Sequence, residues 1–253
     1  MNVIAFCNQK GGVGKTTTAL NVGAALARKG KSVLLVDLDA QGSLTTSAGV
    51  NVADNDVTIY EVLKGLADVN EAIRHRGAYD ILPADIRFSA AELELSNVPG
   101  REKLLQEAIE ELKTPYDVII IDCSPSLSVI TLMGLTACNS VIIPVQAHFL
   151  PLNGMAALLD TIQLVKKRMN PRITIGGVVL TMYDNRRVLA REVKENIAQA
   201  YPNALFNTAI SSSTVLAEAP AAGKDIYEYK PDSKGAQQYE ALTDEIIKRL
   251  SEV

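Results

Sequence analysis

The strongest chemical signal in the sequence is a glycine-rich stretch near its start. The residues from Lys10 to Thr17 read Lys-Gly-Gly-Val-Gly-Lys-Thr-Thr and follow the apolar run 3–7. Because glycine has no Cβ atom, successive backbone N–H groups of such a loop can converge on phosphate oxygens, and the start of a following helix adds positive potential. Lys15 then reaches the β- and γ-phosphates, and the Thr16 hydroxyl ligates Mg²⁺. The predicted nucleotide contacts in this stretch are Lys10, Gly11, Gly12, Val13, Gly14, Lys15, Thr16 and Thr17.

Three carboxylates stand directly after predicted strands. Asp37 and Asp39 follow the apolar run 32–36, and Asp122 follows four apolar residues. Parallel sheets bind their ligands at the carboxyl ends of the strands, so all three side chains are expected beside the phosphates. Asp122 is placed to hold Mg²⁺ directly or through water. Asp37 and Asp39 leave two interpretations open: a part in the chemistry or the metal shell, or capping of a helix that starts near residues 41–42.

The elements that must position these groups can be read from continuous apolar runs. Such runs are typical of strands buried on both faces of a sheet. They are residues 3–7, 32–36, 117–121, 140–145 and 173–182. Helical spacing marks residues 16–29 and 155–169, and a closing helix spans 239–250, while the irregular part 50–101 contains one more strand at 79–82. Strands and helices alternate, which predicts an α/β fold: a mostly parallel twisted sheet with helices on both faces.

Composition narrows the class of protein. With 253 residues, 47% hydrophobic and 21% charged, the chain is expected to form one domain over residues 1–253. The three cysteines show no CxxC spacing, which argues against a disulfide framework or zinc ribbon and fits a reducing cytoplasm. No apolar run reaches the roughly 18 residues of a membrane span. The net charge is −4, yet the segment from Lys166 to Lys194 holds eight basic and two acidic residues, which allows a local basic face.

The phosphate loop departs from the strict pattern in an informative way. Gln9 stands at the first glycine position, and Lys10 is an additional lysine. This combination resembles the deviant Walker A motif, KGGxGKT, of the ParA/MinD family of ATPases. The resemblance covers nearly the whole chain, including residues 33–42, 119–127 and 218–220. The chain is similar to the short Soj-like ParA proteins, which lack an N-terminal helix-turn-helix domain, and the resemblance implies a P-loop NTPase fold.

The resemblance also implies roles for individual residues. Lys15 is the ordinary phosphate lysine, whereas Lys10 reaches across a nucleotide-sandwich dimer to the partner's phosphates. Asp39 positions the attacking water, so Lys10, Lys15 and Asp39 form the catalytic set. Asp122 is the Walker B residue and binds Mg²⁺ together with Thr16.

The adenine pocket is expected near Thr181, Met182 and the turn that contains Ser211. A methionine that follows a strand is equally typical of a core position, and that interpretation stays open. For DNA, the resemblance points to Arg186, Arg187 and Lys224 as phosphate contacts, since nonspecific binding needs flexible cations rather than a base-reading helix. Ser212 and Val215 occupy positions where the family usually has arginines, which predicts weaker DNA binding.

The function that the resemblance implies is an ATP-driven switch. ATP and Mg²⁺ produce a homodimer, the dimer binds DNA nonspecifically on the nucleoid, and a ParB-like partner stimulates slow hydrolysis during plasmid or chromosome segregation. Three alternatives remain: positioning of a protein cargo, a MinD-like membrane switch, and a metabolic enzyme of the dethiobiotin-synthetase type. The acidic residues of the closing helix argue against a stable membrane anchor, and Lys10 argues against the metabolic enzyme.

Overall fold

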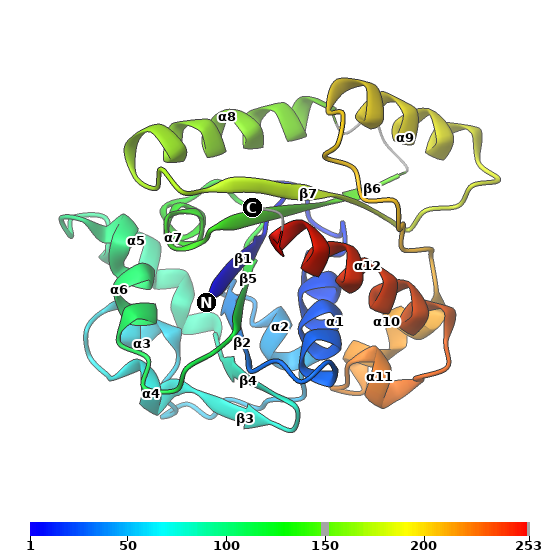
Figure 1. Cartoon of the computed structure of the whole chain (residues 1–253). Helices are drawn as coiled ribbons and strands as arrows, with labels where there is room; N and C mark the ends of the chain where they lie inside the picture. The colour runs from blue at the N-terminus through cyan, green and yellow to red at the C-terminus, as the bar shows by residue number, and fades with distance from the viewer. Residues whose placement is uncertain (148–151, 252–253) are drawn as a thin grey trace.

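One twisted sheet organises the molecule. The structure is a computed structural model and describes residues 1–147 and 152–251. Within these residues seven strands pair in the order β3-β4-β2-β5-β1-β6-β7 (Figure 1). All neighbours are parallel except β3 and β4, which are antiparallel at one edge. The strands are β1 (Asn2–Phe6), β2 (Val33–Leu38), β3 (Arg74–Arg76), β4 (Tyr79–Leu82), β5 (Val118–Cys123), β6 (Ser140–Gln146) and β7 (Thr174–Thr181).

Helices connect the strands and cover both faces of the sheet. The α-helices are α1 (Lys15–Arg28), α2 (Ser43–Ser47), α3 (Ile59–Leu63), α4 (Val69–Ala72), α5 (Ala91–Glu94), α6 (Leu104–Glu110), α7 (Val129–Ala137), α8 (Leu152–Arg168), α9 (Val188–Ala200), α10 (Thr214–Ala221), α11 (Ile226–Tyr229) and α12 (Lys234–Ser251). Two short 3₁₀ helices span Ile86–Ala90 and Arg101–Lys103.

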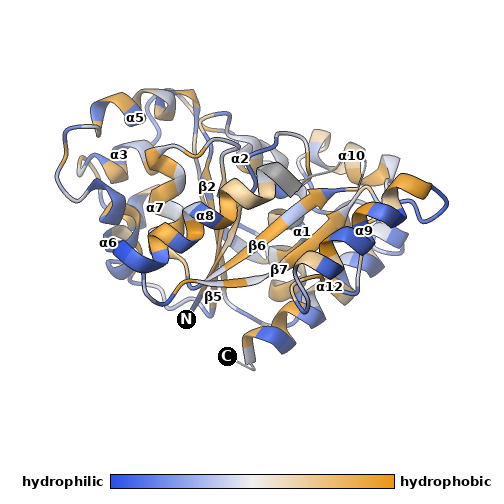
Figure 2. Ribbon diagram, turned by 90° about the horizontal axis from the view of Figure 1, so that it is seen from above, coloured by the Kyte–Doolittle hydropathy of each residue, from blue (hydrophilic) through white to orange (hydrophobic). Residues whose placement is uncertain are grey.

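The core divides into two layers because alternate residues of each strand point to opposite faces. Val3 and Ala5 of β1 belong to the layer under α6, α7 and α8, whereas Ile4 and Phe6 belong to the layer under α1 and α12. In Figure 2 the apolar colour follows β6 and β7 through the middle of the molecule, while the outer helices carry much of the polar colour. This is the doubly covered sheet that the continuous apolar runs predict.

The structure confirms the predicted fold class, and the predicted strands appear within one or two residues of their expected bounds. The elements that were not predicted from the sequence include the edge strand β3 and the helices α6, α7, α9 and α11. Among the described residues, no helix is both long enough and apolar enough to cross a membrane.

Candidate functional site

The phosphate loop joins the carboxyl end of β1 to the start of α1, as the sequence predicts. Gly12 and Gly14 adopt φ values of 71° and 82°, in the left-handed region that favours glycine. A Cβ atom added to Gly11 or Gly12 would meet no other heavy atom within 4 Å, so the loop surface is open for a ligand. Helix α1 begins without a side-chain cap, which leaves its first N–H groups available to an anion.

The two lysines of the loop differ in exposure. Lys15 is buried, with 7% of its surface exposed, and its Nζ donates to the carbonyl oxygen of Lys10 at 3.2 Å. Lys10 is exposed, and its backbone N–H donates to the side chain of Asn8. Asn8 in turn donates to the carbonyl of Pro144 on β6, so the loop that follows β1 is also attached to the neighbouring strand β6. Sequence reasoning missed Asn8, because only the fold brings β6 beside it.

Asp122 and Asp37 lie opposite each other on β5 and β2, and both are almost completely buried. Burial, together with the charge of Asp37, raises the pKa of Asp122 to about 8, although a hydrogen bond from the Thr16 hydroxyl lowers it. The Oδ1 atom of Asp122 is buried without a hydrogen-bond partner in the part of the chain that the structure describes. A buried, unpaired carboxylate oxygen beside a threonine hydroxyl is suited to a cation.

Mg²⁺ fits this position. Proteins typically bind Mg²⁺ through one or two carboxylates together with the phosphates of a nucleotide, rather than in an all-protein cage. Asp122 and Thr16 supply such a set at the foot of the phosphate loop.

The structure separates the two interpretations of Asp37 and Asp39. Asp37 Oδ2 accepts hydrogen bonds from the backbone N and the Oγ1 of Thr45, in the first turn of α2, at 2.8 and 2.7 Å. Burial raises the pKa of Asp37 to about 7, and these bonds from Thr45 oppose the rise. Asp37 therefore caps α2. Within the described residues the Asp39 carboxylate accepts from the backbone of Gln41, which precedes that helix, at 3.0 Å, so the Asp39 side chain does not cap α2.

Asp39 is half-buried and faces a cavity of about 340 Å³ between the segments that follow β2 and β5. The cavity is lined on the other side by residues 124–126 and by Glu92. Its position at the carboxyl edge of the sheet gives Asp39 access to solvent beside the phosphate loop. A carboxylate there has room to orient a water molecule, as the prediction requires.

The residues expected at the adenine lie around one pocket of about 280 Å³. Met182 and Ser211 line it together with Gly14 and Thr17 of the phosphate loop and α1, and Thr181 donates through its hydroxyl to the carbonyl of Val13 at 2.8 Å. The sequence prediction thus brought together residues from distant segments. The sequence prediction did not include the pocket residues from α10 and α12, since the packing of these helices against the phosphate loop brings them there. These additional lining residues are Leu216, Ala217, Pro220 and Tyr239.

The predicted DNA contacts are all on the surface. Arg186, Arg187 and Lys224 are exposed, and Figure 1 shows the β7–α9 and α10–α11 connections on the same side of the molecule. Arg186 donates twice to Asp184, both times at 2.9 Å, and Arg187 lies 3.8 Å from the same carboxylate. The hydrogen bonds from Arg186 lower the pKa of Asp184 to about 2, so Asp184 stays charged at neutral pH. One carboxylate therefore offsets part of the positive charge of this surface.

Comparison with known proteins agrees with this chemistry. A family model described as an AAA domain matches residues 1–175. The chain is 44% identical to the sporulation initiation inhibitor protein Soj of Bacillus subtilis, over 96% of its own length and 97% of that relative. It is 40% identical to the chromosome partitioning protein ParA of Caulobacter vibrioides, over 98% and 95% of the two chains.

A similar solved structure contains a nucleotide and a metal ion. A cobyrinic acid a,c-diamide synthase from Mycobacterium smegmatis, with a bound ATP analogue and magnesium, is 37% identical and has a TM-score of 0.88, covering 99% of this chain and 96% of that one. ATP and Mg²⁺ are therefore the cofactors of this chain. The deviant phosphate loop, the fold and these relatives all agree. The chain belongs to the ParA/Soj family of ATPases.

Proposed function

We propose that this chain is an ATP-driven switch for DNA segregation. ATP brings two copies together, the dimer binds DNA without sequence preference on the nucleoid in the cytoplasm, and hydrolysis stimulated by a ParB-like partner releases it. The cargo is a chromosome or a plasmid. The observation that carries the proposal is the pair of lysines on one phosphate loop, of which one is buried and the other exposed.

The two lysines serve different phosphates in this proposal. Lys15 is held over its own loop by the carbonyl of Lys10, so its charge is directed to the nucleotide of its own subunit. Lys10 stands on the outer side of the loop, where a second triphosphate brought up by another copy would need a cation. Negative charge that develops on a leaving phosphoryl group is stabilised by fixed cations, which gives the cross-subunit lysine a catalytic role.

The remaining groups bind the metal ion, orient the attacking water and accept its proton. Thr16 and Asp122 hold Mg²⁺, which neutralises phosphate charge when it is bound. Asp39 orients the attacking water from its half-buried position after β2 and accepts a proton from it. The cavity beside Asp39 leaves room around an attacking water, so without a partner we expect turnover well below the enzyme median of about 10 s⁻¹.

DNA binding in this proposal depends on dimerisation. Each copy presents Arg186, Arg187 and Lys224 on one side, and a dimer doubles the number of these cations. The logarithm of the affinity falls by about 0.9 per phosphate contact for each tenfold rise in salt, so a surface with few cations binds DNA only when two copies act together. Ser212 and Val215, which carry no charge, keep this number low.

The experiment that tests the proposal measures DNA binding in three nucleotide states. Asp39→Ala protein, which we expect to bind ATP without hydrolysing it, is titrated into two labelled duplexes of unrelated sequence. The titration is done with ATP and Mg²⁺, with ADP, and without nucleotide, and fluorescence anisotropy is recorded. We expect equal affinity for both duplexes with ATP and little binding otherwise. The proposal is contradicted if no binding occurs at low salt, or if the affinity is the same in all three nucleotide states.

The similarity to a diamide synthase favours one second candidate, ATP-dependent amide formation on a carboxylic acid. This candidate predicts ATP turnover that rises when cobyrinic acid and an ammonia source are added together. If DNA has no effect on the protein and these additions accelerate turnover, the synthase function replaces the switch.

A further inference from the structure

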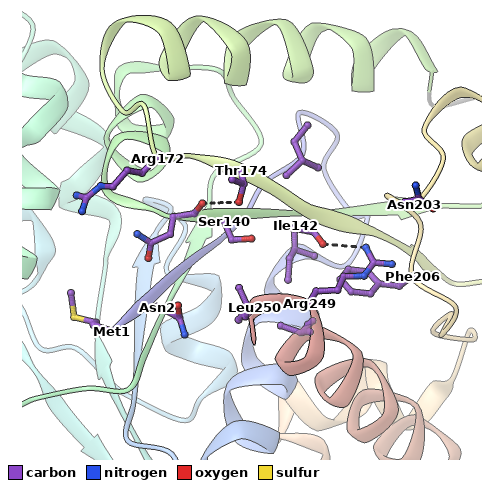
Figure 3. Close-up of a pocket in the computed structure, with 14 residues that line it drawn as sticks. Met1, Asn2, Ser140, Ile142, Arg172, Thr174, Asn203, Phe206, Arg249 and Leu250 are labelled. Carbon is purple, nitrogen blue, oxygen red and sulfur yellow. Dashed lines mark hydrogen bonds between the residues drawn. The ribbon is translucent and has the colours of Figure 1, made fainter. Parts of the chain in front are cut away.

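A cavity of about 590 Å³ opens at the amino-terminal edge of the sheet, opposite to the phosphate loop (Figure 3). The first residues of β1, β6 and β7 form its floor, and the last turns of α12 form one wall. The five residues of β1, at about 3.3 Å each, separate it from the loop that follows that strand. The cavity is therefore a site of its own, and no step proposed above uses it.

The cavity is positively charged. Arg172 and Arg249 line it, and none of the lining residues within the described part of the chain is an aspartate or glutamate. Neither guanidinium forms an ion pair within residues 1–147 and 152–251. Arg249 is fixed by neutral groups: it donates to the carbonyls of residues 176, 204 and 205 and stacks 4.0 Å from the centre of the Phe206 ring. Two positive charges in one cavity favour an anion there.

Two polar side chains of the cavity have hydrogen-bonding capacity left for a ligand. The Ser140 hydroxyl forms no hydrogen bond with any residue that the structure describes and is not fully buried, and Figure 3 places this side chain in the middle of the lining residues. Asn139 uses its Oδ1 to accept from the backbone of Val3, at 2.7 Å, which leaves its NH₂ group for another acceptor. A hydroxyl can both donate and accept, so this serine can hydrogen-bond a ligand in the cavity.

Part of the lining is apolar. Ile142, Phe206, Ile246 and Leu250 form a wall on which the ring of Phe206 and the guanidinium of Arg249 lie together (Figure 3). Pockets of about 300–1,000 Å³ with mostly apolar walls and a few convergent polar groups are typical of small-molecule sites. The volume of this cavity lies within that range.

We propose that this cavity binds a small organic anion. The acidic group of the ligand pairs with Arg172 and reaches the hydroxyl of Ser140, while its apolar or aromatic body packs against Phe206 and Leu250. The proposal is independent of the switch function, because the cavity lies at the opposite edge of the sheet from the ATP site. Binding here is therefore expected to occur equally with and without nucleotide.

A pair of fluorescent probes tests the proposal on the intact chain. The first is 1-anilinonaphthalene-8-sulfonate, an aromatic sulfonate, and the second is N-phenyl-1-naphthylamine, which has the same body without the charge. We expect one sulfonate molecule to bind per chain, roughly tenfold tighter than the amine, and saturating ATP with Mg²⁺ to leave this affinity unchanged.

Variants locate the binding. Arg172→Glu reverses an exposed charge at the cavity and is expected to weaken sulfonate binding roughly tenfold or more. Lys167→Glu makes the same change in charge on the exposed surface of α8, outside the cavity, and is expected to leave the affinity within about twofold. Unchanged ATP turnover shows that both variants are folded. No binding by the wild type, equal binding of the two probes, displacement by ATP, or equal affinity of the Arg172→Glu protein overturns the proposal.

Discussion

The phosphate site and the basic surface around Arg186 are built in different ways. At the phosphate site the functional side chains stand at the ends of buried strands, and Asp37 and Asp122 are held opposite each other by the β2–β5 register. At the basic surface, exposed side chains on a loop form ion pairs with each other, and Asp184 lies between two arginines. The first region is fixed by the sheet, whereas the second depends on contacts that single substitutions can change at little cost to folding.

This difference predicts a division of effects. Changes at the phosphate site should remove a whole step of the cycle, because each group there has one position and one task. Changes at the basic surface should shift an affinity, in either direction, because charge there is additive and screened by salt. The following predictions run from the largest expected effect to the smallest.

Asp39→Ala should lower ATP turnover by about 10²–10⁴-fold, the usual contribution of a positioned proton acceptor, while ATP affinity changes little. Turnover is measured by phosphate release, and affinity with a fluorescent ATP analogue. Glu92→Ala is the matched control, since Glu92 is an exposed carboxylate that lines the same cavity. Undiminished turnover in the Asp39→Ala protein would remove Asp39 from the mechanism.

Lys15→Ala should weaken ATP binding roughly a hundredfold, because hydrogen bonds from a charged group are worth up to about 3 kcal/mol and this lysine is buried at the loop. Binding of the same ATP analogue measures it. Lys31→Ala removes an exposed lysine after α1 and should have no effect. Comparable affinity of the two variants would show that the loop backbone alone holds the nucleotide.

The double change Arg186→Glu and Arg187→Glu should lower the DNA affinity of the ATP-bound protein roughly tenfold or more and make its salt dependence shallower. ATP turnover without DNA should be unchanged, which the phosphate-release assay checks. Lys166→Glu with Lys167→Glu reverses the same charge on α8 and serves as the control. If both pairs weaken binding equally, DNA responds to net charge and not to this surface.

Asp184→Asn should have the smallest effect and the opposite sign. Loss of the carboxylate frees Arg186 from its two hydrogen bonds, so DNA affinity should rise severalfold, by up to one more phosphate contact per copy. Anisotropy at two salt concentrations measures the change, with Glu195→Gln on α9 as the neutralised control. A fall in affinity would mean that Asp184 positions Arg186 for DNA rather than competing with it.

The same contrast explains what the sequence could and could not predict. The phosphate loop and the strands with continuous apolar sequence were predicted because their chemistry is local and their burial is complete. The edge strand β3 was missed, since Arg74, His75 and Arg76 carry no apolar signal and pair with β4 on one side only. Helix α9 was missed because its buried face is small, with Ala190, Val193 and Ile197.

Contacts between distant segments account for the other omissions. The sequence left the role of Asp37 open, and only the position of Thr45 on α2 identifies it as a cap. The pairing of Arg186 with Asp184, two residues away, involves no special spacing and was not foreseen. The cavity around Ser140 gathers residues from the first and last parts of the chain, and no motif marks it.

The most direct test of the central claim is the mass of the Asp39→Ala protein in solution. Sedimentation velocity with ATP and Mg²⁺ should give twice the 27.2 kDa of one chain, and ADP should give the single-chain mass. Adding Lys10→Ala to this variant should return the ATP-bound protein to the single-chain mass while it still binds the ATP analogue. The same mass in ATP and ADP, or a stable ATP dimer without Lys10, would contradict the account of two lysines that serve two nucleotides.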